Sequence, residues 1–159
     1  MPILQQKPVT PSGRFYLKNK VEVSKKRPEK SLTKGHHRKK GRNTYGRITS
    51  RRRGGGHKRL YRTIDFRRNR FDESAKITAI EYDPNRTAHI ALLEYGDGEK
   101  CYILCPEGVH IGDEILSSQN KIDFKTGNAM PLKHMPLGTK VHCVEMLPGA
   151  GAKIARTAG

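Results

Sequence analysis

The residues best suited to chemistry lie between Gly46 and Arg70, in the stretch GRITSRRRGGGHKRLYRTIDFRRNR. Arginine dominates this stretch, three consecutive glycines stand near its centre, and Asp65 is its only acid. The planar guanidinium of arginine suits bidentate contacts with phosphate and also stacks on nucleobases. Glycines let backbone amides approach a phosphate closely. The pattern predicts a phosphate-binding segment, and the alternative is a solvated basic loop that contacts nothing.

Aromatic residues in and beside this stretch favour RNA over a nucleotide. Tyr45 and Tyr61 would supply the stacking surfaces that looped and single-stranded RNA uses, and His57 would add a hydrogen bond. A nucleotide-hydrolysing P-loop requires Lys followed by Ser or Thr, whereas Lys58 is followed by Arg59. The segment therefore lacks the hydroxyl that would bind a magnesium ion.

The cysteines do not form a metal site in the sequence pattern. Cys101 and Cys105 lie in a predicted strand, where four positions span about 13 Å, too far to share one ion. Cys143, His110 and His142 complete no recognised zinc spacing. We expect buried structural cysteines, no metal and no cofactor.

No catalytic constellation emerges either. The acids form adjacent pairs, Asp72 with Glu73 and Asp113 with Glu114, whose side chains would point to opposite faces of a strand. No nucleophile stands beside a base. We expect a protein that is not an enzyme.

The charge is strongly asymmetric along the chain. The 159 residues carry a net charge of +17, and residues 1–70 contain 23 of the 32 lysines and arginines with only three acids. Residues 71–159 contain nine basic and twelve acidic residues. This imbalance predicts a polyanionic partner for the first part and a more ordinary fold for the second.

The first 59 residues read as an extended arm. Prolines interrupt any helix, and only three of the 36 residues from Ser24 to Arg59 are apolar, so this segment alone should be disordered. No apolar run is long enough to span a bilayer, and the N-terminus lacks the apolar core of a signal peptide. Three cysteines, an odd number, suit a reducing compartment.

From Leu60 onward the pattern changes to strands. Alternation and β-branched residues predict strands at 60–66, 76–82, 87–95, 99–105, 113–118 and 138–147. DPNR at 83–86 predicts a type I turn, and GDG at 96–98 predicts a hairpin loop. Short strands at this spacing favour an all-β fold, a small antiparallel barrel.

Three stretches together resemble a known family. NTYGRITSRRRGGGHKRLYRTIDFRRNR, IEYDPNRTAHIALLEYGDGEKCYIL and GNAMPLKHMPLGTKVHCVEMLPGAGAKIARTAG are similar, in order and spacing, to the family of the bacterial-type large-subunit ribosomal protein number two. The resemblance covers the chain from about Gly41 to its last residue. After the long basic arm at 1–59, it implies an OB-fold-like RNA-binding barrel at 60–125 and the beginning of an SH3-like (translation-protein) barrel at 126–159.

The resemblance also implies a function. It is that of a structural constituent of the large ribosomal subunit, which binds 23S-type ribosomal RNA near the peptidyl-transferase region and supports assembly and subunit association. The other implied partners are neighbouring ribosomal proteins, and the implied location is the ribosome of a bacterial cytoplasm, a mitochondrion or a plastid. The expected RNA-binding residues are Arg42, Arg47, Arg51, Arg52, Arg53, Gly54, Gly55, Gly56, His57, Lys58, Arg59, Tyr61, Arg62, Arg67, Arg68, Arg70, Arg86, Lys153 and Arg156.

The sequence departs from the family where it stops, at Gly159, before the remainder of the second barrel and before the Gly/His-rich C-terminal extension. We expect that this barrel does not close alone, that a separate chain supplies the rest or the sequence is a split or truncated product, and that support of peptidyl transfer does not carry over. The alternative from another class is a free OB-fold module or RNA chaperone acting through aromatics on its barrel. The position of the charge, in the arm, favours the ribosomal interpretation.

Overall fold

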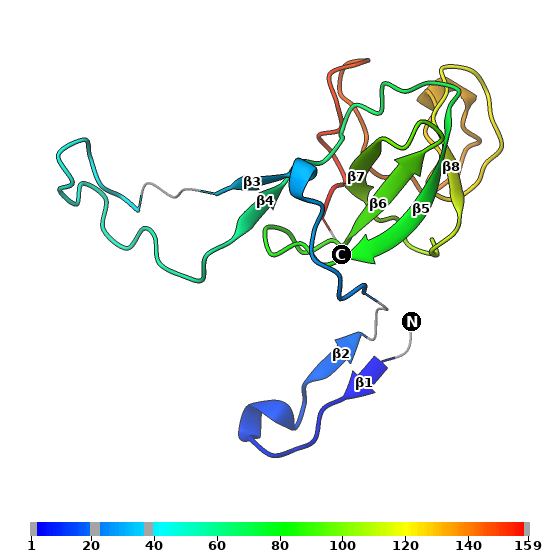
Figure 1. Ribbon diagram of the computed structural model, residues 1–159. Coiled ribbons are helices and arrows are strands. Elements are labelled where there is room, and N and C mark those ends of the chain that lie inside the picture. Colours follow the sequence, from blue (N-terminus) through cyan, green and yellow to red (C-terminus); the bar gives the residue numbers. More distant parts are fainter. Residues whose placement is uncertain (1–2, 20–22, 37–39, 158–159) are drawn as a thin grey trace.

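The computed structural model describes residues 3–19, 23–36 and 40–157 (Figure 1). Parts of the predicted arm, at 1–2, 20–22 and 37–39, lie outside the described residues. The elements in chain order are β1 (Ile3–Gln5), the 3-10 helix η1 (Pro11–Gly13), β2 (Leu17–Asn19), η2 (Lys30–Leu32), β3 (Thr33–Gly35), β4 (Leu60–Arg62), β5 (Ser74–Glu81), β6 (Ile90–Tyr95), β7 (Lys100–Leu104), β8 (Glu114–Leu116) and η3 (Leu132–His134). The prediction of an all-β class is confirmed.

A four-stranded antiparallel sheet, in the order β7-β6-β5-β8, forms the centre of the molecule. Side chains alternate between its faces, so that Leu93 and Ile103 lie in one buried cluster and Leu92 and Tyr102 in the other. The pairing of β5 with β6 shifts by one residue between Ile77 and Ala79. This β-bulge changes which side chains of β5 face each side of the sheet. Because both faces are buried, the register of the strands is strongly specified.

The chain before the sheet covers its second face. Leu32, Ile64 and Phe66 pack against the cluster that contains Tyr102. The backbone amide of Asp65 donates to the carbonyl of Tyr102 at 2.8 Å, and the amide of Thr63 donates to the carbonyl of Leu32 at 2.9 Å. The sheet therefore orders part of the predicted arm, whose own sequence is too polar to form a core.

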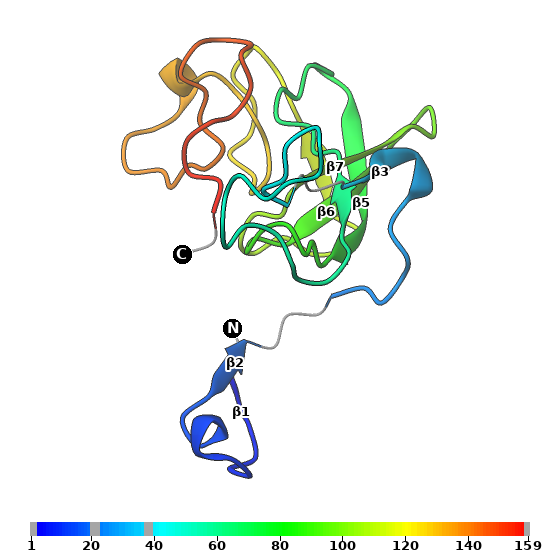
Figure 2. The ribbon, with the colours of Figure 1, turned by 90° about the vertical axis from the view of Figure 1, so that its left-hand side faces the viewer.

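Strands β3 and β4 form an antiparallel pair, with Thr33 opposite Arg62 and Gly35 opposite Leu60. We call residues 33–62 the basic hairpin. It extends to the left of the sheet in Figure 1, and its end lies in front of the sheet in Figure 2, where that side faces the viewer. The hairpin therefore leaves the sheet at one place and carries its charge away from the core.

Several predicted strands are shorter in the structure. The strand predicted at 60–66 ends at Arg62 and continues only as a bridge between Ile64 and Tyr102, and the strand predicted at 87–95 begins at Ile90. The prediction of a strand at 138–147 is wrong, because only Val144 forms a bridge there, with Ile154, and Cys143 has a φ of 54°. Within the described ranges the main sheet is open, so both barrels stay predictions.

The residues after the sheet form an irregular layer beside it. Arg68 Nη1 donates to the carbonyl of Gly127 at 2.7 Å, and the amide of Ala152 donates to the carbonyl of Phe66 at 2.9 Å. We call residues 117–157 the C-terminal segment. These bonds attach it to residues 65–68. The part of the chain that the structure describes contains no helix long and apolar enough to cross a membrane.

Candidate nucleic-acid interface

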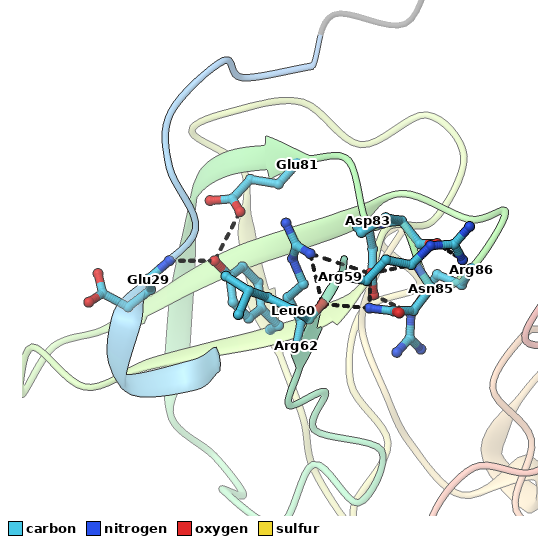
Figure 3. Close-up of polar contacts among 10 residues, drawn as sticks. Glu29, Arg59, Leu60, Arg62, Glu81, Asp83, Asn85 and Arg86 are labelled. Carbon is cyan, nitrogen blue, oxygen red and sulfur yellow. Dashed lines mark hydrogen bonds and ion pairs between the residues drawn. The ribbon is translucent and has the colours of Figure 1, made fainter. Parts of the chain in front are cut away.

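A buried acid, Asp83, holds the base of the basic hairpin. Asp83 is 0% exposed, its Oδ2 accepts from Nε of Arg86 at 2.6 Å, and its Oδ1 lies 3.9 Å from Nη1 of Arg62 (Figure 3). Arg62 is itself only 9% exposed, and its Nη1 donates to the carbonyl of Leu60 at 3.0 Å. A buried carboxylate between two guanidinium groups is stable only while both partners remain. Asp83 therefore fixes β4, the second strand of the hairpin, to the sheet.

The remainder of the DPNR turn strengthens this attachment. Nδ2 of Asn85 donates to the carbonyl of Leu60 at 2.7 Å, and Nη1 of Arg59 donates to the carbonyl of Pro84 at 2.7 Å. The predicted turn at 83–86 is present: the amide of Arg86 donates to the carbonyl of Asp83, and the amide of Asn85 donates to its carboxylate. The turn thus holds the hairpin through its backbone as well as its charges.

The first strand of the hairpin is held by a hydrogen-bond chain. The backbone amide of Glu29 donates to the Tyr102 hydroxyl at 3.0 Å, and that hydroxyl donates to Oε2 of Glu81 at 2.9 Å (Figure 3). Burial raises the pKa of Tyr102 to about 12. Upstream, the amide of Ser24 donates to the carbonyl of Ile80 at 2.7 Å. Residues 24–32 therefore lie on the sheet before β3 begins.

Glu81 makes the stability of this attachment depend on pH. Burial raises the pKa of its carboxyl above the ordinary 4.5, against the hydrogen bond from Tyr102 and the nearby Arg62. A raised folded-state pKa contributes stability below the unfolded pKa, and this contribution is lost as the pH rises through the folded pKa. We expect Glu81→Gln to raise Tm at pH 7, with a difference from wild type that shrinks toward pH 4.5. Paired thermal melts across this range measure it.

The exposed Glu107 has no recorded side-chain partner, so Glu107→Gln is the control that removes the same charge. Its difference from wild type should not follow the same pH course. A Glu81→Gln variant less stable than wild type at pH 7 would contradict the prediction.

The end of the hairpin is held closed by backbone hydrogen bonds. The carbonyl of Gly41 accepts from the amides of Thr49 and Ser50 at 2.9 and 3.1 Å. Arg42 and Ile48 form an antiparallel bridge. Gly41 has a φ of 68°, and a Cβ there would lie 2.3 Å from the carbonyl oxygen of Ser50. Only glycine fits this position.

We therefore expect Gly41→Ala to open the end of the hairpin without unfolding the sheet. The added methyl group must displace the Ser50 carbonyl, and the left-handed backbone costs about 1 kcal/mol or more for alanine. Backbone order parameters measured by NMR should fall between residues 41 and 50. Gly46→Ala is the control, because Gly46 has a φ of 76° but nothing within 4 Å of its Cβ position. An equal loss of order in both variants would contradict the steric account.

Free cations gather on the basic hairpin. The exposed side chains of Arg47, Arg51, Arg52, Arg53 and Lys58 have no recorded partner within the described ranges. No acid lies between Glu29 and Asp65 in the sequence. The predicted residues Arg42 and His57 are also exposed, and their side chains contact only backbone carbonyls of the hairpin. The hairpin therefore presents positive charge that the protein itself does not neutralise.

The glycine run has mixed roles. Gly54 has a φ of 100°, and a Cβ there would lie 2.9 Å from Cβ of Lys40. Gly55 and Gly56 also have positive φ values, 79° and 77°. The run thus adopts left-handed backbone conformations that L side chains disfavour. The absence of a side chain at Gly54 therefore leaves space for Lys40. Phosphate contact at the three glycines stays a prediction.

Other predicted RNA-binding cations already have partners. Arg70 pairs with Asp97 at 2.8 Å, with Glu99 and with Glu73, and stacks over the ring of Tyr95. Arg62, Arg68 and Arg86 contact groups of the protein, as described above, and Arg156 stacks 4.9 Å from the centre of the Phe66 ring. The remaining three are exposed: Tyr61 stacks on His36, while Arg67 and Lys153 line a hollow beside Gly151. The structure thus leaves five predicted cations of the hairpin free, whereas Arg62, Arg68, Arg70, Arg86 and Arg156 near the sheet contact protein groups.

The cysteines lie away from the hairpin. Cys101, Cys105 and Cys143 are free and partly buried, and burial raises the pKa of each thiol. In the described part of the chain no three His, Cys, Asp or Glu side chains gather as a metal site would require.

Sequence reasoning misses the residues that position the hairpin. The sequence marks Asp83 and Asn85 only as turn residues and Tyr102 only as part of a strand, and it assigns no role to Glu29 or Glu81. Nothing in the turn pattern indicates that Leu60 and Arg62 approach Asp83. These contacts join parts of the chain that only the folded sheet brings together.

This arrangement defines the class of the protein. An all-β sheet holds, at a buried ionic cluster, a long hairpin rich in unpaired arginine, and such a localised basic extension is typical of nucleic-acid-binding proteins. The hairpin carries the unpaired positive charge, and the sheet positions the hairpin.

Comparisons with known proteins give the particular family. Residues 29–117 match the model described as ribosomal proteins L2, RNA binding N-terminal domain, and residues 125–159 match that of ribosomal proteins L2, C-terminal domain. The chain therefore belongs to the ribosomal protein L2 family. The first match begins at the residue whose amide meets Tyr102 and so includes the whole hairpin with its attachment.

Bacterial relatives cover nearly all of the chain. The large ribosomal subunit protein uL2 of Ruegeria sp. (strain TM1040) is 56% identical over 160 residues, which cover 100% of this chain and 57% of the relative. The uL2 proteins of Rickettsia canadensis and Akkermansia muciniphila are 57% and 55% identical, over 96% of this chain and 56% and 55% of their own lengths. The chain thus spans a little more than half the length of these relatives.

Proposed function

We propose that this chain is a structural component of the large ribosomal subunit that binds 23S-type ribosomal RNA through its basic hairpin. The observation that carries the proposal is the set of five unpaired cations between Arg47 and Lys58, on a hairpin whose base is fixed at Asp83. Free arginines neutralise phosphates and release counterions on binding. Because the base is already ordered, less entropy is lost than for a free arm.

The names of the relatives support the ribosomal assignment over a free RNA-binding module, since each is called a large ribosomal subunit protein. All three are bacterial, which favours the ribosome of a bacterial cytoplasm over that of an organelle. Binding near the peptidyl-transferase region, and a role in assembly and subunit association, belong to the proposal. No catalytic step by this chain is part of it.

Neighbouring proteins are the second class of proposed partner. Leu137, Met146 and Leu147 in the C-terminal segment are exposed apolar side chains, and Val144 there forms only a single bridge, with Ile154. Such a surface fits a polypeptide partner. Contact with neighbouring ribosomal proteins would cover it.

A competition experiment tests the proposal. Labelled bacterial 23S ribosomal RNA bound to the full chain is challenged with base-paired RNA of equal length and unrelated fold, at several salt concentrations. We expect the ribosomal RNA to be retained against a large excess of competitor at moderate salt. Equal competition at every salt concentration, with binding lost as salt rises, would leave only nonspecific electrostatics and contradict the proposal.

A further inference from the structure

The end of the basic hairpin carries an aromatic ring that the protein does not use. Tyr45 is 88% exposed, whereas Tyr95 and Tyr102 are buried in the sheet. Tyr61, at the base of the same hairpin, stacks on His36 with ring centroids 6.3 Å apart. Among the described residues no ring or cation contact is recorded for Tyr45. The free face of this ring is open to a ligand.

The turn beneath Tyr45 is ordered by several bonds. The amide of Gly46 donates to the carbonyl of Asn43 at 3.1 Å, and the amide of Asn43 donates to the carbonyl of Arg47 at 3.0 Å. The side chain of Asn43 forms a third hydrogen bond, in which its Oδ1 accepts from the amide of Arg47 at 3.0 Å. Gly46, with a φ of 76°, completes a tight turn of the kind found in three-residue hairpin loops. Tyr45 therefore projects from a backbone already fixed before binding.

The charges around the ring select the ligand. Arg42 and Arg47 flank the turn with exposed side chains, and no acid lies anywhere between Glu29 and Asp65. An apolar protein partner would leave these cations unpaired. A nucleotide offers both a π-face for the ring and phosphates for the arginines.

From this placement we propose that Tyr45 stacks on an unpaired nucleobase of RNA, with Arg42 and Arg47 on the flanking phosphates. The inference rests on the proposed function and adds the class of RNA feature that the hairpin reads. Bases inside an A-form duplex are stacked on their neighbours, so the site would be a loop, a bulge or an end. The ordered turn reduces the entropy lost on binding.

The chain contains no tryptophan, which permits a direct test. Tyr45→Trp places the chain's single tryptophan, which can be excited without the tyrosines, at the end of the hairpin, and Tyr82→Trp places it at an exposed position after β5 as the control. We expect bound bacterial 23S ribosomal RNA to quench emission from position 45 and to leave emission from position 82 unchanged. Single-stranded oligoadenylate should quench position 45 more than an abasic oligonucleotide of equal length.

Affinity provides a second readout. Tyr45→Phe keeps the ring and should bind 23S ribosomal RNA like wild type, whereas Tyr45→Leu should bind about 5- to 150-fold more weakly, as expected when one base-stacking interaction of about 1–3 kcal/mol is removed. Equal binding by the leucine variant, or weaker binding without quenching at position 45, would overturn the inference while the proposed function stands. If the wild-type chain fails to bind the RNA at all, the proposed function fails first.

Discussion

Replacing Asp83 by alanine is expected to remove about 3–5 kcal/mol from the free energy of unfolding, the cost typical of breaking a buried ion pair from one side. The aspartate is fully buried, and its loss leaves Arg62 and Arg86 without their carboxylate inside the protein. Asn85 also loses the acceptor of two hydrogen bonds. This is a large share of the roughly 5–15 kcal/mol that stabilises a typical domain.

The loss of stability in Asp83→Ala should be largest at the base of the basic hairpin. Equilibrium denaturation measures the change in stability, and amide exchange should accelerate at Leu60 and Arg62 beyond the change at β6. Asp123→Ala is the control, since Asp123 is exposed and its carboxylate has no recorded partner. If Asp83→Ala and Asp123→Ala melt alike, Asp83 does not hold the hairpin.

Neutralising the free cations of the hairpin is expected to weaken RNA binding by about 100- to 1,000-fold at 0.1 M salt. Each phosphate that is no longer neutralised reduces the slope of log affinity against log salt by about 0.7 to 0.9, so four of them reduce it by about 3. The variant replaces Arg51, Arg52, Arg53 and Lys58 by glutamine. These side chains have no recorded partners in the described structure, so the sheet should fold as before.

A second variant with the same loss of positive charge shows whether the position of the cations or the net charge of the chain determines affinity. Lys121, Lys125, Lys133 and Lys140 are exposed and lie after the sheet, and their replacement by glutamine removes four positive charges as well. We expect that variant to change the salt slope little. Filter binding from 0.05 to 0.5 M salt compares the two, and equal slopes would show that net charge alone governs affinity.

The sheet is largely predictable because its chemistry is local. Alternation in KITAIEY and EKCYILC marks strands that the structure contains as β5 and β7, and the DPNR pattern marks the turn at 83–86. The bulge between Ile77 and Ala79 is not predictable, because either residue is apolar enough for either face. At 138–147 the apolar pattern predicts a strand, yet a left-handed residue at Cys143 interrupts it.

The interface is predictable as a composition and not as an arrangement. Every arginine from 42 to 70 looks alike in the sequence, yet Arg70 meets three carboxylates and Arg51 meets none. The bond between Glu29 and Tyr102 joins residues 73 positions apart. Such long-range pairing depends on the folded sheet, so no local pattern reveals which cations remain free for RNA.

Ultraviolet cross-linking of the full chain to 23S ribosomal RNA, followed by identification of the attached peptide, shows most directly whether the basic hairpin binds this RNA. A protease that cuts after glutamate releases residues 30–73 as one fragment, because no glutamate lies between Glu29 and Glu73. We expect most cross-links to fall in this fragment, at residues 40–59. Cross-links confined to residues 74–157 would contradict this expectation, because the RNA would then contact the sheet or the C-terminal segment in place of the hairpin.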